Sequence, residues 1–437
     1  MPTVSLLRFA RERFAAFREL WWQIWFQDKP TSPLEITRIG IGAALLLHYG
    51  LATPYLFELW GDAGWMPRDL AVSNDPWSLS LFFLFTHPSQ FVVFHVLFLA
   101  SCAAFMIGWR TSWVKWAVLV GQISYDHRNP MLTYGVDKIL ACLLFILCLA
   151  PIGRALSLDR VRAVRAAKRK NLDASLPLYS SPWVGACTRL MQIQMATLFF
   201  YSAINKIGGD DWWYGDAVWL VFSTDEFYSP VILSVLASRY WLVNVATYGT
   251  ILIEIAFPFM IWQQRTRPYL LALALFLHAQ FALLMGLFYF SFVMMMGHMS
   301  FVRPEWLTRL GLAWKRRIGD MEMIYDGQCG FCLRSMIWFL AFDGLGQIKT
   351  RNFRTDPYPV VSDAQMEKAL YLVLPDGRAL PGFEAYRYVV LRVPGLWWQV
   401  PFFYVPVFSR LIGHPIYNWV AGNRGWLSSV MRSQRRS

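Results

Sequence analysis

At residues 323–332 the chain reads MIYDGQCGFC, and this stretch decides how the C-terminal part of the protein folds. Its apolar start predicts a strand, and its Asp-Gly pair predicts a turn. The apolar periodicity that follows predicts a helix over 330–342. Cys329 and Cys332 then lie in the first turn of that helix, where the positive end of the helix dipole stabilises a thiolate.

The spacing of the two cysteines favours thiol-disulfide exchange, and strand, turn, CxxC and helix follow the thioredoxin-type order. We expect Cys329 at the helix start to be the nucleophile and Cys332 to resolve the mixed disulfide. Asp326 either orients the site and accepts its protons or is only a turn residue that caps the helix. A half zinc site and a structural disulfide are the alternatives. Zinc requires four ligands, and His414 stands alone in this part of the chain, so no metal is expected.

The composition predicts a polytopic membrane protein. Of 437 residues, 56% are hydrophobic and only 16% are charged, whereas soluble proteins carry about 25% charged residues. The formal net charge is +13. In a membrane protein an excess of Lys and Arg marks cytoplasmic loops, so we expect membrane lipid and not nucleic acid as a partner. The other cysteines adjoin apolar runs and are expected to be buried packing residues: Cys102, Cys142, Cys148 and Cys187.

Recurring apolar runs of about twenty residues predict about eight membrane crossings. The dense basic segment 153–171 marks a cytoplasmic loop by the positive-inside rule. Eight crossings make every basic cluster cytoplasmic, including both termini, and place the CxxC in the cytosol, where a dithiol is kept mostly reduced. The predicted spans are 35–56, 89–109, 112–126, 133–151, 184–205, 241–262 and two short helices within 268–302 that break near Gly286.

The chain is therefore expected to form a helical membrane bundle followed by a small α/β domain. The predicted parts are an amphipathic helix on the membrane surface over 1–30, the bundle over 31–305, a basic linker over 306–320 and the α/β domain over 321–437.

Within the α/β domain, alternating strand and helix patterns predict a mixed sheet. Strands are predicted at 321–325, 347–353, 369–374 and 378–380, and helices at 330–342, 383–392 and 402–426. The aromatic run 397–404 is expected either to rest on the membrane interface or to be domain core.

Ionisable residues within the predicted spans are candidate functional groups, because they are costly in a bilayer. They are His48, Glu254, His278 and His298, with Lys206 at the outer end of the fifth span. Each His taken singly is explained by a neutral imidazole bonded across helices. Taken together, the five residues predict a polar cavity in the outer half of the bundle.

The C-terminal motifs also have a family resemblance. Asp326 followed by the CxxC, and the later sequence Tyr417…Ala421-x-Asn423-Arg424, make residues 321–430 resemble the DCC family of thiol-disulfide oxidoreductase-like proteins. The resemblance implies a thioredoxin-like fold, a thiol-disulfide oxidoreductase activity, and a protein dithiol or disulfide as the partner.

Short motifs of the first 305 residues follow one another in a second family order. They are Trp60-Gly61-Asp62-Ala63-Gly64, Arg128-Asn129-Pro130…Tyr134-Gly135, Tyr201…Asn205-Lys206…Trp212…Gly215, Glu254 and Leu277-His278. With them, residues 30–305 resemble the HTTM domain, the bacterial relative of the vitamin K-dependent gamma-carboxylase.

The HTTM resemblance implies a bacterial inner-membrane protein in which Lys206 is the base that deprotonates a reduced, vitamin K-like quinone. A lysine in an apolar pocket can supply the neutral amine that this step needs. The chain departs from the carboxylase motif near Asn129-Pro130, where a His is replaced. The resemblance therefore implies a quinone or lipid pocket and not carboxylation of protein Glu.

Three functions are compatible with the sequence. The first is a membrane-tethered, cytosol-facing thiol-disulfide oxidoreductase that uses Cys329 and Cys332. The second is a quinol-linked membrane enzyme with Lys206 as its base. The third is a non-enzymatic membrane module that binds lipid or a partner and senses redox state through the CxxC.

Overall fold

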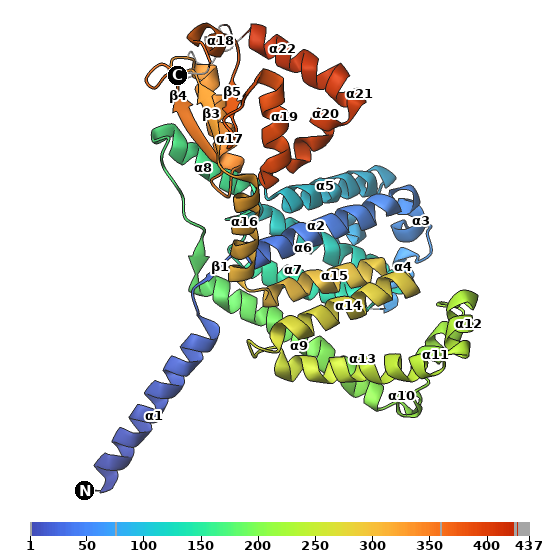
Figure 1. Cartoon of the computed structure of the whole chain (residues 1–437). Coiled ribbons are helices and arrows are strands. Elements are labelled where there is room, and N and C mark those ends of the chain that lie inside the picture. Colours follow the sequence, from blue (N-terminus) through green and yellow to red (C-terminus); the bar gives the residue numbers. More distant parts are fainter. Residues whose placement is uncertain (1, 75–76, 359–360, 424–425, 427–437) are drawn as a thin grey trace. The chain divides into compact units, whose positions relative to one another are not determined.

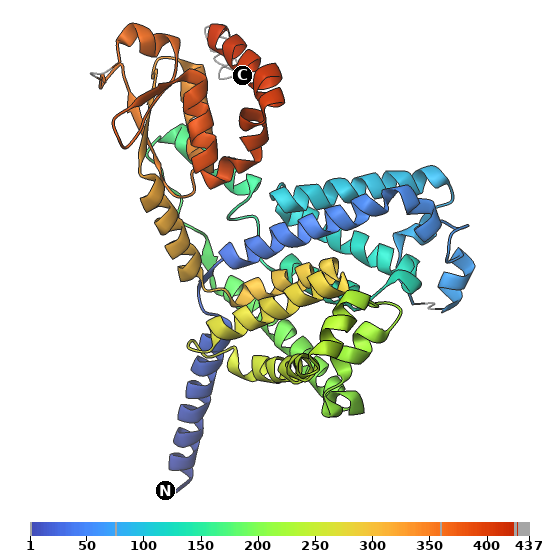
Figure 2. The same cartoon turned by 45° about the vertical axis from the view of Figure 1, so that its right-hand side comes forward.

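The computed structural model describes residues 2–74, 77–358, 361–423 and 426 (Figure 1, Figure 2). The chain divides into two compact units, and each is described by itself. The bundle unit is Met1–Asp159 with Leu178–Arg303, and the α/β unit is Arg160–Pro177 with Pro304–Ser437.

Each predicted span of the bundle unit contains a helix. Local signals fix several ends: Ser181 caps one helix by accepting the Val184 N–H, and the left-handed Gly108 ends another at φ 72°. The helices are α2 (Ser32–Ala52), α5 (Pro88–Ile107), α6 (Thr111–Arg128), α7 (Gly135–Leu149), α9 (Pro182–Ile207), α13 (Trp241–Met260), α14 (Arg267–Met285) and α15 (Phe288–His298).

The predicted break near Gly286 is confirmed. Gly286 takes a left-handed φ of 72° and ends α14, and the chain returns as α15. A residue with a side chain is strained in this conformation, so glycine suits the turn. α14 and α15 lie side by side (Figure 1), and α15 also packs on α2.

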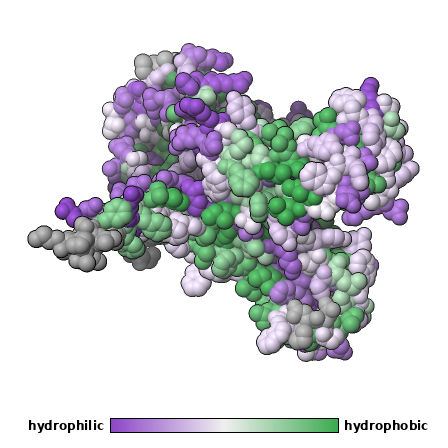
Figure 3. Space-filling model, turned by 90° about the horizontal axis from the view of Figure 1, so that it is seen from below, coloured by the Kyte–Doolittle hydropathy of each residue, from purple (hydrophilic) through white to green (hydrophobic). Residues whose placement is uncertain are grey.

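The apolar helices make this a membrane protein. Among the described residues, four stretches are long and apolar enough to cross a bilayer: Ser32–Trp60, Pro88–Ile107, Trp241–Met260 and Arg267–Met285. Hydrophobic side chains, in green, gather on the face seen from below (Figure 3). α7 and α15 have 15 and 11 residues, about 22 and 16 Å against a bilayer core of about 30 Å. The count of eight crossings therefore stays a prediction.

Two segments outside the spans are also helical. α1 (Pro2–Trp25) confirms the predicted N-terminal helix, whose place on the membrane surface stays a prediction. The basic segment 153–171, which was predicted as a loop, contains α8 (Leu158–Lys170). Its Ala, Arg and Lys residues are strong helix formers, and Asp159 in the first turn complements the helix dipole.

The α/β unit contains the four predicted strands in one sheet. The strand order is β4-β3-β5-β6, with β3 parallel to β4 and antiparallel to β5. Its core joins β3 to α17 and α19 through buried residues such as Met323, Phe339 and Val389. The elements are β3 (Met321–Tyr325), α17 (Gly330–Phe342), β4 (Ile348–Asn352), α18 (Asp363–Lys368), β5 (Tyr371–Val373), β6 (Ala379–Pro381) and α19 (Gly382–Arg392).

The helical structure predicted across 402–426 is divided by prolines into short helices. Pro401, Pro406 and Pro415 lack the N–H that an uninterrupted helix needs, so each stands in the first turn of a new short helix. The segment reads η5 (Pro394–Gln399), α20 (Val400–Tyr404), α21 (Pro406–Phe408), η6 (Ser409–Gly413) and α22 (His414–Gly422).

The basic stretch predicted as a linker over 306–320 is largely helical. It forms most of α16 (Pro304–Ile318), which groups with the α/β unit. Trp314 fixes α16 to that unit, because its indole N–H donates to the Arg392 carbonyl at 2.9 Å.

Candidate active site

The two cysteines meet at the start of α17, as the sequence predicts. β3 ends at Tyr325, and a short turn carries the chain to Cys329, which is the N-cap residue of the helix. The Cys329 Sγ accepts the Cys332 backbone N–H at 3.3 Å. Both side chains are half-buried, so the pair is shielded in part and remains within reach of a partner.

This geometry prepares Cys329 for nucleophilic attack. The hydrogen bond from the Cys332 side chain lowers the pKa of Cys329 to about 6, and backbone N–H groups of Cys332 and Phe331 act in the same direction. Burial and the charge of Asp326 oppose this shift. A thiol with this pKa is mostly thiolate at neutral pH, which is the form that attacks disulfides.

Asp326 serves the turn and an ion pair, and it does not cap α17. Its Oδ1 accepts the Gln328 N–H at 2.9 Å. The Arg354 guanidinium binds both carboxylate oxygens, at 3.2 and 3.1 Å. Burial alone would raise the pKa of Asp326, but Arg354 and the backbone donors outweigh it, so the pKa is lowered. The capping alternative for Asp326 is wrong, because the cap atom is the Cys329 sulfur.

Two residues that the sequence analysis did not select complete this site. Asn352 ends β4, and its Oδ1 accepts the N–H groups of Gly327 and Arg354 at 3.0 and 3.2 Å. Arg354 also binds Glu367 at 2.8 Å. The predicted strands could have indicated Asn352 and Arg354, because the carboxyl ends of neighbouring parallel strands lie at one edge of a sheet.

In the bundle unit, Lys206 and Glu254 form an ion pair across α9 and α13. Lys206 Nζ lies 3.0 Å from Glu254 Oε1 and 2.6 Å from Ser202 Oγ. The Glu254 side chain is 6% exposed and that of Lys206 is 21% exposed. The Trp212 ring lies 5.2 Å from Nζ. Lys206 therefore has a carboxylate partner that the sequence analysis did not pair with it.

The three candidate histidines lie at two separate positions in the bundle unit. His278 and His298 are buried with ring centroids 5.3 Å apart, and the Phe199 ring contacts both. His298 Nδ1 lies 2.5 Å from the Met294 carbonyl. His48 lies on the exposed side of α2 and stacks on Tyr289 at 4.4 Å. The five residues that were predicted to form one polar cavity therefore form three sets: the Lys206–Glu254 ion pair, the His278–His298 pair and the separate His48.

Two motifs that lie far apart in the sequence of the bundle unit contact each other in the structure. The buried Arg128 donates to the carbonyls of Gly61 and Met66 at 2.8 and 2.9 Å and pairs with Asp62 at 3.1 Å. Asn129 Nδ2 donates to the Leu59 carbonyl at 2.7 Å. Residues 59–66 and the end of α6 therefore form one network, which explains why their motifs occur together.

A second buried ion pair was not predicted. Glu35 and Arg38 are fully buried in α2 and bond at 2.8 Å. Arg38 also donates to the Phe105 and Leu156 carbonyls, and Glu35 accepts the Arg154 N–H at 2.7 Å. Because both charges have several partners, the pair fastens chain segments together and offers no open group for chemistry.

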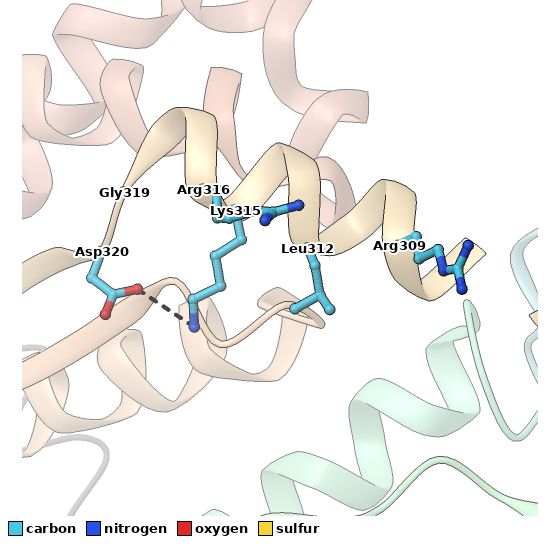
Figure 4. Close-up of a pocket in the computed structure, with 6 residues that line it drawn as sticks. All are labelled: Arg309, Leu312, Lys315, Arg316, Gly319 and Asp320. Carbon is cyan, nitrogen blue, oxygen red and sulfur yellow. Dashed lines mark ion pairs between the residues drawn. The ribbon is translucent and has the colours of Figure 1, made fainter. Parts of the chain in front are cut away.

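A shallow hollow of the α/β unit runs along α16 (Figure 4) and lies outside the dithiol site. Lys315 and Asp320 form an ion pair there at 3.4 Å. The remaining lining residues are Arg309, Leu312, Arg316 and Gly319. In the part of the chain that the structure describes, no group of three or more His, Cys, Asp or Glu could hold a metal ion.

The closing motif of the α/β unit lies against α19. Tyr417 contacts the Phe383 ring, with centroids 6.0 Å apart. Asn423 is the C-cap residue of α22, and its side chain donates to the Trp419 carbonyl at 2.8 Å. Arg424, the last residue of this motif, lies outside the described residues.

Comparison with known proteins matches both parts of the chain. A family model described as HTTM domain matches residues 26–306, and one described as DCC1-like thiol-disulfide oxidoreductase matches residues 323–429. The uncharacterized protein YitO of Bacillus subtilis (strain 168) is 25% identical over 209 residues, which are 46% of this chain and 64% of that protein. This chain thus covers less than two thirds of that relative. No solved structure matches significantly.

Proposed function

Because the chain belongs to the HTTM-domain family and continues into a DCC1-like part, we propose that it is a membrane-anchored thiol-disulfide oxidoreductase. One observation carries the proposal: Cys329 caps α17 and accepts hydrogen bonds that lower its pKa to about 6. The order β4-β3-β5-β6, with the CxxC after the first strand, supports a thioredoxin-like fold.

The reaction proceeds through two exchanges. The Cys329 thiolate attacks one sulfur of a substrate disulfide, forms a mixed disulfide and releases the other substrate sulfur as a thiolate. The Cys332 thiol, after losing its proton, attacks the Cys329 sulfur and releases the second substrate thiolate. The substrate gains two electrons and the chain keeps an internal disulfide. The reverse sequence oxidises a dithiol.

The proposed location is the inner membrane of a bacterium, with the dithiol in the cytosol. The supporting observation is charge: Arg and Lys are dense in 153–171 and follow the bundle at Arg309, Lys315 and Arg316. A cytosolic dithiol is held mostly reduced, so reduction of a partner's disulfide is the proposed physiological direction.

Three cysteine variants of the full chain test the redox function. Reduced Cys329→Ser loses insulin reduction, whereas Cys332→Ser traps a mixed disulfide on Cys329. Cys142→Ser is the matched control, because Cys142 is a free, exposed cysteine of the bundle unit. The prediction that Cys142 is buried is therefore wrong. Insulin reduction that persists in Cys329→Ser would show that the CxxC is not the reductant.

The ion pair of Lys206 and Glu254 favours a second candidate function, a quinone- or lipid-binding pocket in the bundle. The bundle unit also offers a group for a polar head group, because the buried His278 has no hydrogen-bond partner for either ring nitrogen in the described part of the chain. Lys206 would act as base after passing its proton to Glu254, and His278 would hydrogen-bond a carbonyl oxygen. A bound quinone would supply two-electron chemistry. Quinone that co-purifies with the wild-type chain and is lost in Lys206→Ala tests this candidate.

A further inference from the structure

We propose that the α/β unit docks on an anionic membrane surface through the outer face of the segment 394–422. This surface, here called the docking face, consists of Trp397, Trp398, Phe402, Leu411, Ile416 and Trp419. Their exposed fractions lie between 45% for Phe402 and 73% for Leu411. The proposal concerns the location of the unit and does not depend on its redox chemistry.

The docking face is exposed because the opposite side of the same segment packs against the rest of the α/β unit. Leu396 is fully buried in the core of the unit. The Tyr404 hydroxyl donates to the Arg387 carbonyl at 2.9 Å, and the His414 ring lies on Phe383 with centroids 3.8 Å apart. The segment is therefore fixed to the unit, and its outer apolar residues cannot turn inward without breaking these contacts.

The composition of the docking face suits a lipid interface. Several large apolar side chains exposed along one segment indicate a partner surface or a membrane, because soluble proteins rarely expose large apolar patches. Trp is enriched where a membrane meets water, because its ring is apolar and its indole N–H is polar. Three of the six docking-face residues are Trp, and the Trp397 N–H already donates to the Leu391 carbonyl at 3.0 Å.

The charged residues near the docking face favour an anionic bilayer over an uncharged protein as its partner. After Glu384 the remaining 53 residues contain no Asp or Glu and seven Arg. Arg392 precedes the docking-face residues in the chain, and the exposed Arg410 lies between Phe402 and Leu411. Trp314 of α16 contacts Trp397 edge to face with centroids 5.7 Å apart, so the cationic helix α16 adjoins the same face. An apolar surface in a segment whose charged residues are all Arg complements anionic phospholipid.

The α/β unit is continuous in sequence with the membrane-spanning bundle unit. The second part of the α/β unit begins at Pro304, directly after Arg303, the last residue of the bundle unit. A docked segment would hold α17 by its C-terminal end, where Trp338 and Phe342 contact Trp398. The dithiol at the other end of α17 would lie roughly 15 Å away. It would then serve partners that are themselves at the membrane surface.

Site-specific photocrosslinking of the full chain tests the proposal. A benzophenone amino acid replaces Leu411 in protein reconstituted in vesicles of phosphatidylethanolamine and phosphatidylglycerol. The same probe at Asp356 is the matched control, because that side chain is 66% exposed and follows β4, an edge strand that contributes no residue to the docking face. Illumination is followed by mass analysis of the adducts.

The expected result is a lipid adduct at position 411 with a yield several times that at position 356. The yield falls when phosphatidylcholine replaces phosphatidylglycerol. Four results would each overturn the proposal: equal yields at the two positions, no dependence on anionic lipid, a crosslink from 411 to the bundle unit, or a crosslink to a second copy. The last two would assign the docking face to protein contact.

Discussion

At the scale of single residues, Cys332 and Asp326 act on Cys329 in opposite directions. The Cys332 side chain donates to the sulfur and lowers its pKa, whereas the Asp326 carboxylate raises it. Arg354 binds that carboxylate through two hydrogen bonds. The reactivity of the dithiol therefore depends on hydrogen bonds and charges within the turn that precedes α17.

Cys332→Ala removes the strongest donor to the Cys329 sulfur. We expect the pKa of Cys329 to rise from about 6 toward the ordinary thiol value of about 8.5. Because the thiolate is the reactive form, alkylation of Cys329 at pH 7 slows by roughly tenfold. The pH dependence of alkylation by iodoacetamide measures both quantities, in a background without the other cysteines. A midpoint that stays near pH 6 would assign the shift to the backbone donors.

Asp326→Asn tests the opposing charge. Asn keeps an Oδ1 that accepts the Gln328 N–H, so the turn is retained, while the negative charge near the sulfur is lost. The pKa of Cys329 falls below about 6, and the alkylation profile moves to lower pH. Glu367→Gln is the control, because it removes the other carboxylate partner of Arg354. A profile that moves to higher pH in Asp326→Asn contradicts this electrostatic account.

At the scale of elements, the site is built where two parallel strands end. β3 leads into the turn of Asp326 and Gly327, and β4 ends at Asn352, whose side chain accepts the Gly327 N–H. The pairing of β3 with β4 thus brings Arg354 to the CxxC turn. Neither strand alone could position these groups.

Gly327→Ala should disturb this junction. A Cβ at Gly327 would lie 2.3 Å from the Asn352 side-chain nitrogen, so Asn352 must give up its bonds to the turn. We expect a loss of about 1–3 kcal/mol, measured as a lower urea midpoint for exposure of Cys332 to a thiol probe in the reduced full chain. Gly344→Ala is the control, since a Cβ there meets nothing within 4 Å. Equal midpoints for the two variants would show that the junction is not a constraint.

At the scale of the whole molecule, the two candidate sites lie in different units of the chain. The dithiol belongs to the α/β unit and the Lys206–Glu254 pair to the bundle unit. With the predicted topology they also lie at opposite faces of a bilayer core about 30 Å thick. We therefore expect them to be separable.

Lys206→Ala should abolish quinone or lipid binding by the bundle and leave the reduction potential of the dithiol unchanged. Cys329→Ser should do the reverse. Lys138→Ala, at an exposed lysine of α7, controls for the loss of a charge. The measurements are extraction of bound quinone and redox titration against glutathione. Rapid mixing of reduced protein with a soluble quinone analogue provides the opposing test: quinone reduction that vanishes in both single variants would establish one electron path and refute separation.

The predicted topology has eight crossings and both termini in the cytoplasm. A reporter fused after Ser437 that is active only in the cytoplasm should be active, and one that requires the periplasm should be silent. Replacing the basic residues of 153–171 should disturb insertion more than replacing those of 8–18, because they are denser and lie close to two spans. A periplasmic signal after Ser437 would require an odd number of crossings.

The sequence by itself determined the features that depend on local chemistry. Hydrophobic periodicity placed the membrane helices, Gly286 predicted the break between α14 and α15, and the CxxC after a strand predicted the start of α17. The apolar periodicity of 402–426 did not indicate the breaks within this segment, which occur where Pro406 and Pro415 begin new short helices. These features arise from residues close together in the chain, so their signals are readable without a fold.

Only the tertiary structure decided which distant residues become partners. Arg354 meets Asp326 across 28 positions, Lys206 meets Glu254 across 48, and Arg38 meets the Leu156 carbonyl across 118. No local pattern specifies such pairs, because they depend on strand register and helix packing that sum contributions from whole elements. The polar residues of the bundle were visible as a set, but their division into an ion pair, a His pair and a separate His48 follows from which helix faces pack together.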